Sequence, residues 1–216
     1  MLMRSILNYG CLFAALGWVH FASAASFDCA KAKSLVEKTI CSDGELSKLD
    51  EKLSEVYKIS LKEHPVQNYV RARQREWIRD NNTCDKAKLA VCLRNNYEKR
   101  ILTLTDISTA KVYSNTEKFE YSNGDAVAEI REKNGKFFIN VWGGFRVHRQ
   151  ASQAAGKEVY LGCDFEGSFI SKNGGKAMSL SGDTFEFKIS GNKLTYTDLR
   201  CEGFGSLPDE LVLTGK

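Results

Sequence analysis

The side chains of this sequence that could do the most chemistry are its seven cysteines, which can form disulfides, bind metals or act as nucleophiles. Cys11 lies in an N-terminal segment that is expected to be removed. An even set behind a secretory leader is typical of a disulfide framework, because bridges persist in oxidising compartments. The close Cys-x2-4-Cys spacing of structural zinc sites is absent between Cys84 and Cys92. We therefore expect disulfides, with no metal ligand and no thiol left for catalysis, from Cys29, Cys41, Cys84, Cys92, Cys163 and Cys201.

Catalytic motifs built on other side chains are missing from the sequence. It contains no His-Glu-x-x-His, no Gly-x-Ser-x-Gly, no phosphate-binding glycine loop and no dinucleotide fingerprint. Beyond the leader, His64 and His148 stand singly in polar surroundings and are expected at the surface. The sequence thus predicts no catalytic residue and no cofactor. A deep polar cleft with converging ionisable groups would instead indicate an enzyme.

Two pairs of carboxylates are close enough in sequence to suggest acid–base work on a glycoside. They are Glu129 with Glu132, and Asp164 with Glu166. Because no recognisable cleft motif accompanies them, we interpret all four as outward-facing residues of β-strands.

Residues 1–24 have the three parts of a signal peptide. Arg4 supplies the positive charge, an apolar run follows over 11–21, and Ala22-Ser23-Ala24 is a small-residue cleavage site. A membrane span needs about 20 consecutive apolar residues, and this run is shorter and interrupted. We therefore predict a periplasmic or secreted protein whose mature chain starts at Ala25, with no membrane span.

The formal net charge of +4 comes mainly from the first half of the chain, and the second half is close to neutral. Arg71, Arg75 and Arg79 recur every four residues and would line one helix face, where they could meet an anionic partner. Alternatively, they form a solvated face that is partly paired with Glu76 and Asp80. Export and the neutral second half argue against nucleic acid as a partner.

Apolar residues recur at helical spacing through 25–105. Helices are predicted over 45–62 and 66–81, because His64-Pro65 separates them and the residue before a proline is driven out of the α region. Ser42-x-x-Glu45 has the form of a capping box for the first helix. A short helix is expected over 29–38, and a third amphipathic helix contains Leu93, Tyr97, Arg100, Ile101 and Leu104.

Four cysteines flank these helices and allow three connectivities. The helices over 45–62 and 66–81 should form an antiparallel hairpin, in which the start of the first lies beside the end of the second. This arrangement favours a bridge from Cys41 to Cys84, and leaves Cys29 to pair with Cys92.

After Asp106 the apolar residues alternate with a period of two, as they do in strands. The run over 184–189 is the clearest, and Asn134-Gly135 fits a type I′ hairpin turn, whose two central residues need a positive φ. We predict an antiparallel meander of about six to eight strands, a small barrel or sandwich, with a bridge from Cys163 to Cys201. The chain is therefore expected to be an α+β protein, with a disulfide-braced helical domain over 25–105 and a β domain over 106–216.

The cysteines of the helical half stand in extended local motifs. Phe27-Asp28 precedes Cys29, Thr39-Ile40 precedes Cys41, and Leu93 follows Cys92. The motifs over about 27–104 also include Glu37, Leu46, Leu49, Asp50, Leu53, Tyr57, Gln74, Trp77, Cys84, Tyr97 and Arg100. On these residues the helical half resembles the N-terminal domain of the LprI-type lysozyme inhibitors, a family of exported bacterial domains. Within that fold, the aromatic residues are expected in the core, and the polar Glu37, Gln74 and Arg100 are expected to bond one another or helix ends.

The β half is similar to the C-terminal extension of some members of that family, through Cys163-Asp164-Phe165-Glu166-Gly167 and Cys201-Glu202-Gly203. The β-barrel lysozyme inhibitors place a Ser-Gly-x-x-Tyr loop in the lysozyme cleft. This chain has Ser181-Gly182-Asp183-Thr184-Phe185, with Phe in place of Tyr. Ser181, Gly182 and Phe185 are therefore candidate contacts, unless the segment is an ordinary turn that enters a strand.

The resemblance and the missing motifs predict a noncatalytic envelope protein that binds and inhibits a wall-degrading enzyme such as lysozyme. Lysozymes are commonly basic, so the near-neutral β half is the expected contact. Two alternatives remain: a periplasmic immunity protein that neutralises a delivered toxin, and a general envelope-binding module that uses the arginine face.

Overall fold

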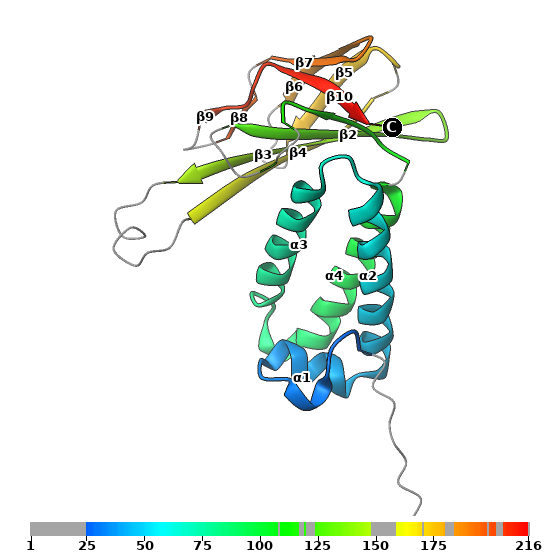
Figure 1. The fold of residues 1–216 in the computed structure, drawn as a ribbon, viewed down its shortest axis with the longest axis vertical. Coiled ribbons are helices and arrows are strands. Elements are labelled where there is room, and N and C mark those ends of the chain that lie inside the picture. Colours follow the sequence, from blue (N-terminus) through cyan, green and yellow to red (C-terminus); the bar gives the residue numbers. More distant parts are fainter. Residues whose placement is uncertain are drawn as a thin grey trace, which may run out of the picture.

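A helical domain is joined to a closed antiparallel β-barrel in the computed structural model of the chain (Figure 1). In Figure 1 the three longest helices stand side by side beneath the barrel, and a short helix lies across their far end. This arrangement confirms the α+β class expected from the sequence. The structure describes residues 25–107, 109–116, 119, 124–147, 159–169, 171–179, 184–197, 199–201 and 205–215.

The helical domain follows the predicted periodicity closely. The two central helices begin and end within one residue of the expected bounds, and the short leading helix is split by a turn. None of the helices that the structure describes is both long enough and apolar enough to cross a membrane. The helical elements are η1 (Cys29–Lys31), α1 (Leu35–Ser42), α2 (Gly44–Glu63), α3 (Gln67–Asn81), η2 (Lys86–Lys88) and α4 (Leu89–Ile107).

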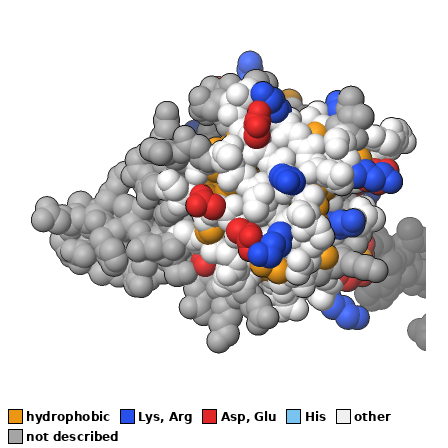
Figure 2. Space-filling model, turned by 90° about the horizontal axis from the view of Figure 1, so that it is seen from above, with side chains coloured by type: hydrophobic (Ala, Val, Ile, Leu, Met, Phe, Trp, Pro, Cys, Tyr) orange, Lys and Arg blue, Asp and Glu red, His pale blue; other side chains and the backbone are white. Residues whose placement is uncertain are grey.

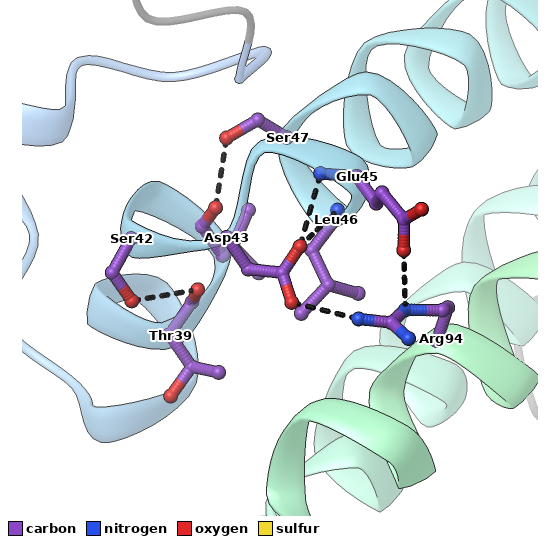
Figure 3. Close-up of polar contacts among 8 residues, drawn as sticks. Thr39, Ser42, Asp43, Glu45, Leu46, Ser47 and Arg94 are labelled. Carbon is purple, nitrogen blue, oxygen red and sulfur yellow. Dashed lines mark hydrogen bonds and ion pairs between the residues drawn. The ribbon is translucent and has the colours of Figure 1, made fainter.

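The cap of α2 is Asp43, which corrects the predicted capping box of Ser42 and Glu45. Asp43 Oδ1 accepts hydrogen bonds from two backbone N–H groups of the first turn, at 2.9 and 3.1 Å (Figure 3). Its Oδ2 accepts a hydrogen bond from Arg94 Nη2 at 2.9 Å. Ser42 instead donates its hydroxyl to the carbonyl of Thr39 at 3.1 Å. The prediction was wrong because Ser42 is still the last residue of α1, so the chain enters α2 one residue later than expected.

Replacement of this cap gives a direct test. Asp43→Ala is expected to lower the free energy of unfolding by about 1–2 kcal/mol, since an N-cap side chain is lost. The Leu46 N–H and then Arg94 lower the pKa of Asp43 against the effect of burial. The contribution is therefore present above the unfolded pKa of about 3.9 and is lost as the pH falls through the folded pKa.

Urea unfolding at about pH 7 and pH 2.5 measures both effects. The deficit of Asp43→Ala should shrink at the lower pH. Ser42→Ala is the matched control and should stay within about 0.5 kcal/mol of the parent protein. An equal loss of stability in the two variants would mean that Ser42 caps α2, as the sequence predicted.

The disulfides of the helical domain are local, which overturns the predicted connectivity. Cys29 is bonded to Cys41, and Cys84 to Cys92, with Cα separations of 5.8 and 6.0 Å. The bridges from Cys41 to Cys84 and from Cys29 to Cys92 are therefore wrong. The prediction ignored the short segments between the cysteines of each bonded pair. These segments contain η1, which begins at Cys29 and leads toward Cys41, and η2, which lies between Cys84 and Cys92, and they turn the chain so that each cysteine meets the next one in the sequence. Cys163 is also disulfide-bonded, but the side chain of its predicted partner Cys201 lies outside the described residues.

The β domain is a barrel, which resolves the choice between barrel and sandwich. Its strands follow one another around the barrel in the order β1-β10-β7-β6-β5-β4-β3-β2, and β8 and β9 form a separate pair. The Asn134-Gly135 turn has φ values of 53° and 72°, so the predicted positive φ at both positions is confirmed. The strands are β1 (Lys111–Ser114), β2 (Asp125–Lys133), β3 (Lys136–Val147), β4 (Val159–Phe169), β5 (Gly174–Ser179), β6 (Thr184–Ser190), β7 (Lys193–Tyr196), β8 (Arg200–Cys201), β9 (Gly205–Ser206) and β10 (Glu210–Gly215).

Strands β1 to β3 are covered on both faces. Ala126 and Ala128 point into the barrel core. The alternate residues Val112, Val127 and Trp142 belong to one apolar cluster with the cores of α3 and α4. Because side chains alternate across a strand, the outer face of the barrel serves as the packing surface for the helical domain. The two domains therefore share a continuous core, and polar residues next to it are drawn into the interface.

Candidate functional site

A polar cleft with a volume of about 330 Å³ lies where α3 and α4 face strands β2 to β4. This size is at the lower end of the range for small-molecule sites, about 300–1,000 Å³. Ionisable side chains from both domains converge on it. They are Arg73, Glu76 and Asp80 from α3, Lys99 and Arg100 from α4, and Glu129, Arg131, Asp164 and Glu166 from the barrel.

Strand register places the barrel side of the cleft. Glu129 of β2 pairs with Asn140 of β3, which pairs with Glu166 of β4, so these residues form one row across three strands. The next outward-facing row contains Val127, Trp142 and Asp164. The prediction that Glu129, Asp164 and Glu166 face outward from strands agrees with this register. The helices then cover part of that outer face, which the sequence pattern did not indicate.

Arg73 ties the two domains together at one end of the cleft. Its guanidinium binds Glu76 on its own helix at 2.8 Å and Asp164 of β4 at 3.0 Å. The same group lies 5.6 Å from the centre of the Trp142 ring. Burial opposes the charge of Arg73, but Asp164, Tyr69 and Glu76 together outweigh burial, and the pKa of Arg73 is raised. Burial also raises the pKa of Asp164, with Arg73 acting in the opposite direction. This cluster is structural, because the one guanidinium of Arg73 binds both carboxylates and so links α3 to β4.

Arg100 lies at the floor of the cleft and is only 8% exposed. Its Nε donates a hydrogen bond to Gln74 Oε1 at 3.1 Å, whereas Nη2 has no hydrogen-bond partner among the described residues. Burial, and then the nearby charge of Arg73, lower the pKa of Arg100 to about 10. At neutral pH the side chain is therefore a buried cation whose hydrogen-bond partner is a neutral amide.

Glu129 of β2 lines the same cleft and is 2% exposed. Its Oε1 is 3.4 Å from Nε2 of His64, a separation that allows an ionic contact without the geometry of a hydrogen bond. On its other side, His64 Nδ1 lies 3.0 Å from the backbone nitrogen of Val66 and 3.1 Å from the Val66 carbonyl oxygen. His64 is 3% exposed, so its predicted surface position is wrong. It ends α2 where the helical domain meets the barrel, and its ring packs 5.4 Å from that of Tyr69.

The arginine face of α3 lies apart from this cleft. Arg75 and Arg79 are exposed, and Arg71 is partly buried and donates to Asn68 Oδ1 at 3.2 Å. Arg79 is 3.8 Å from Asp80. The expected pairing with Asp80 is therefore present but long, and Glu76 binds Arg73 instead of the arginine face.

The predicted inhibitory loop receives no support from the structure. Phe185 is 4% exposed and packs against Phe165 and Phe187 inside the barrel. It is therefore a core residue and not a contact, because the alternation of β6 turns it inward. Ser181 and Gly182 lie outside the described residues.

Glu37, Gln74 and Arg100 bond a helix end or one another, as expected from the sequence. Glu37 accepts the backbone N–H of Ser34, whose hydroxyl accepts the N–H of Glu37, so the two form the capping box of α1. Gln74 binds Arg100. Within the described part of the chain, no three His, Cys, Asp or Glu side chains converge as a metal site.

The described basic and acidic side chains of the barrel face that points away from the helices are interspersed in Figure 2, and no patch of one sign covers the described part of that face.

The chain matches no protein-family model, no curated protein and no solved structure. The cleft is therefore the main structural indication of its function. Sequence reasoning missed this site because its residues are distant in the chain, although one signal was present. Val127 and Trp142 are large apolar residues on the outward side of their strands, and such residues indicate that another element covers that face.

Proposed function

We propose that the protein is exported to the cell envelope and acts there by binding and inhibiting a wall-degrading enzyme such as lysozyme. Disulfides between described cysteines are compatible with an oxidising compartment. The leader-like N-terminus and the resemblance of the helical half to LprI-type inhibitors support the same compartment and role.

The observation that carries this proposal is the acidic rim of the cleft. Glu166 and Asp80 are both exposed where β4 and α3 border the cavity. Commonly basic lysozymes present arginine and lysine side chains, and exposed carboxylates at a concave surface give them complementary contacts. These two carboxylates outnumber the one lysine, Lys99, that is exposed in the described lining of the same cavity.

Lysozyme turnover of cell-wall substrate, with a molar excess of the mature, disulfide-intact protein, tests the proposal. Inhibition is expected, and the double variant Asp80→Lys with Glu166→Lys should weaken it at least about tenfold, or about 1.4 kcal/mol. Glu210→Lys is the matched control, because β10 lies across the barrel from β4, and it should inhibit as well as the parent protein. Full lysozyme activity in the presence of the parent protein would remove the proposal.

The arginine face of α3 supports a general envelope-binding role as one alternative. Charge reversal at Arg71, Arg75 and Arg79 should abolish association with envelope fractions if that role is correct. An immunity protein would instead be captured with a delivered toxin from competitor-exposed cells. If the protein instead inhibits a wall-degrading enzyme, neither of these two results is expected.

A hydrolytic role is the second candidate, and the row of Glu129, Asn140 and Glu166 favours it. Two carboxylates flanking a cleft are the requirement for glycoside hydrolysis, and the two glutamates lie two strands apart. If the protein is a hydrolase, the parent should release soluble fragments from purified cell wall, and both Glu129→Gln and Glu166→Gln should lose this activity. That result would favour the hydrolytic role over the proposed role as an inhibitor.

A further inference from the structure

The floor of the cleft holds a cation and an anion that are not bonded to each other. Arg100 and Glu129 are 8% and 2% exposed, and both line the same cavity. Arg100 Nη2 and Glu129 Oε1 have no hydrogen-bond partner among the described residues. Buried charges in proteins are nearly always paired and hydrogen-bonded, because an isolated charge is costly to remove from water. The floor therefore has the chemistry of a site that a ligand completes.

Neighbouring residues hold both groups in place without hydrogen-bonding those atoms. Arg100 Nε donates to Gln74 Oε1, and His64 Nε2 lies 3.4 Å from Glu129 Oε1, an ion-pair distance without the geometry of a hydrogen bond. Asn140 lies between Glu129 and Glu166 in the row across β2 to β4, and it donates its amide to Glu166 at 3.3 Å while its Oδ1 has no hydrogen-bond partner among the described residues. The floor thus presents the Arg100 donor from the helical side, and both acceptors and the Arg131 donor from the barrel side.

We propose that the floor binds a small α-amino carboxylate, which is an amino acid or a short peptide. The carboxylate of such a ligand binds the guanidinium of Arg100, a pairing that is among the strongest in proteins. Arg131 lines the same cavity and supplies a second donor through its Nε, which has no hydrogen-bond partner among the described residues, while its Nη1 lies 3.7 Å from Asp106 Oδ2. The ammonium group binds Glu129 Oε1 and Asn140 Oδ1.

The dimensions and charge of the cleft fit this class. A volume of about 330 Å³ accommodates an amino acid or dipeptide. A zwitterion neutralises the buried cation and the buried anion together, whereas a simple anion or amine leaves one of them unpaired. The residues exposed at the mouth are Lys99, Asp80 and Glu166. The ligand side chain would point toward this polar opening, so the site should select less for the side chain than for the carboxylate and ammonium groups.

Calorimetric titration of the mature, disulfide-intact protein tests this inference independently of lysozyme. The probes are L-alanine, D-alanine and L-alanyl-L-alanine, with propionate and ethylamine as single-charge comparators. At least one zwitterion is expected to bind at least about tenfold more tightly than either comparator, which corresponds to about 1.4 kcal/mol. No heat from any zwitterion up to about 10 mM, or equal binding of propionate, would overturn the proposal.

Two variants assign the site. Arg100→Met and Glu129→Gln should each weaken zwitterion binding at least about tenfold. Arg100→Met also removes the hydrogen bond to Gln74 Oε1 and a cation that interacts with the buried Glu129, so its melting temperature is expected to fall below that of the parent. Arg75→Met, on the exposed face of α3, is the matched control and should bind normally. If Arg100→Met does not fold, Glu129→Gln decides, and parent-like affinity in that variant contradicts the assignment.

Discussion

Asp50→Ala is expected to lower the free energy of unfolding by about 3 kcal/mol, which is among the largest effects of any single polar substitution in the helical domain. Asp50 is 8% exposed in α2. Its Oδ2 accepts hydrogen bonds from the backbone N–H and the hydroxyl of Ser26, at 2.7 and 2.6 Å, and its Oδ1 accepts one from the hydroxyl of Tyr97 at 2.8 Å. Hydrogen bonds to charged groups contribute about 1.5–3 kcal/mol each. Since Ser26 can bond to water after the substitution, the total is smaller than the sum.

The same contacts explain what Asp50 does for the fold. They fix the segment that begins at Ala25 against α2 and connect it to Tyr97 of α4, so one carboxylate joins three parts of the helical domain. Asp50→Asn should cost less than Asp50→Ala, because one amide oxygen can still accept a hydrogen bond. Urea unfolding at neutral pH measures both variants.

Asp80→Ala is the matched control, since that side chain is 68% exposed and its removal should change the free energy of unfolding by no more than about 0.5 kcal/mol. If Asp50→Ala were as mild as this control, the hydrogen bonds to Ser26 and Tyr97 would have no net stabilising effect.

Several elements of this fold were predictable because each depends on a local rule. The boundary between α2 and α3 follows from the restriction that Pro65 places on His64, and the hairpin between β2 and β3 follows from Asn134-Gly135. The capping box of Ser34 and Glu37 has the S-x-x-E form. It was overlooked because the same form recurs at Ser42, and the pattern alone does not decide where the chain turns.

The cleft could not be predicted, because it depends on how two domains pack. Glu129 was correctly interpreted as an outward-facing strand residue, but period-two alternation does not tell which element covers the outer face. Arg73 lay away from the regular arginine spacing, and this offset is what points it toward Asp164 instead of solvent. The error at Phe185 has a different cause. A short motif match was preferred over the alternation that places Phe185 and Phe187 on the same inner face.

Arg73→Met is expected to lower the free energy of unfolding by about 2–3 kcal/mol at neutral pH. Loss of one partner leaves a buried carboxylate without its counterion, which costs about 3–5 kcal/mol in fully buried pairs. The side chains of Arg73 and Asp164 are about a quarter exposed, at 24% and 25%, so solvent screening reduces the cost. The contact of the guanidinium with Trp142 contributes a further part of about 0.5–1 kcal/mol.

A double-mutant cycle separates these contributions. Asp164→Asn in the Arg73→Met background should cost less than the same change in the parent, with a coupling energy of about 1–2 kcal/mol. Arg79→Met, whose side chain is 67% exposed, is the matched control and should be nearly neutral.

The pH dependence of Arg73→Met tests the electrostatic origin of its cost. Burial already raises the pKa of Asp164, and Arg73 opposes that shift, so the pKa of Asp164 should rise further in the variant. A carboxyl group whose folded pKa exceeds its unfolded value destabilises the fold only when it is ionised. That cost is present above the folded pKa and disappears as the pH falls below the unfolded value of about 3.9. The deficit measured by urea unfolding should therefore be smaller at about pH 3 than at pH 7. An equal deficit at both pH values would mean that Arg73 stabilises the interface through its packing on Trp142 and not through its charge.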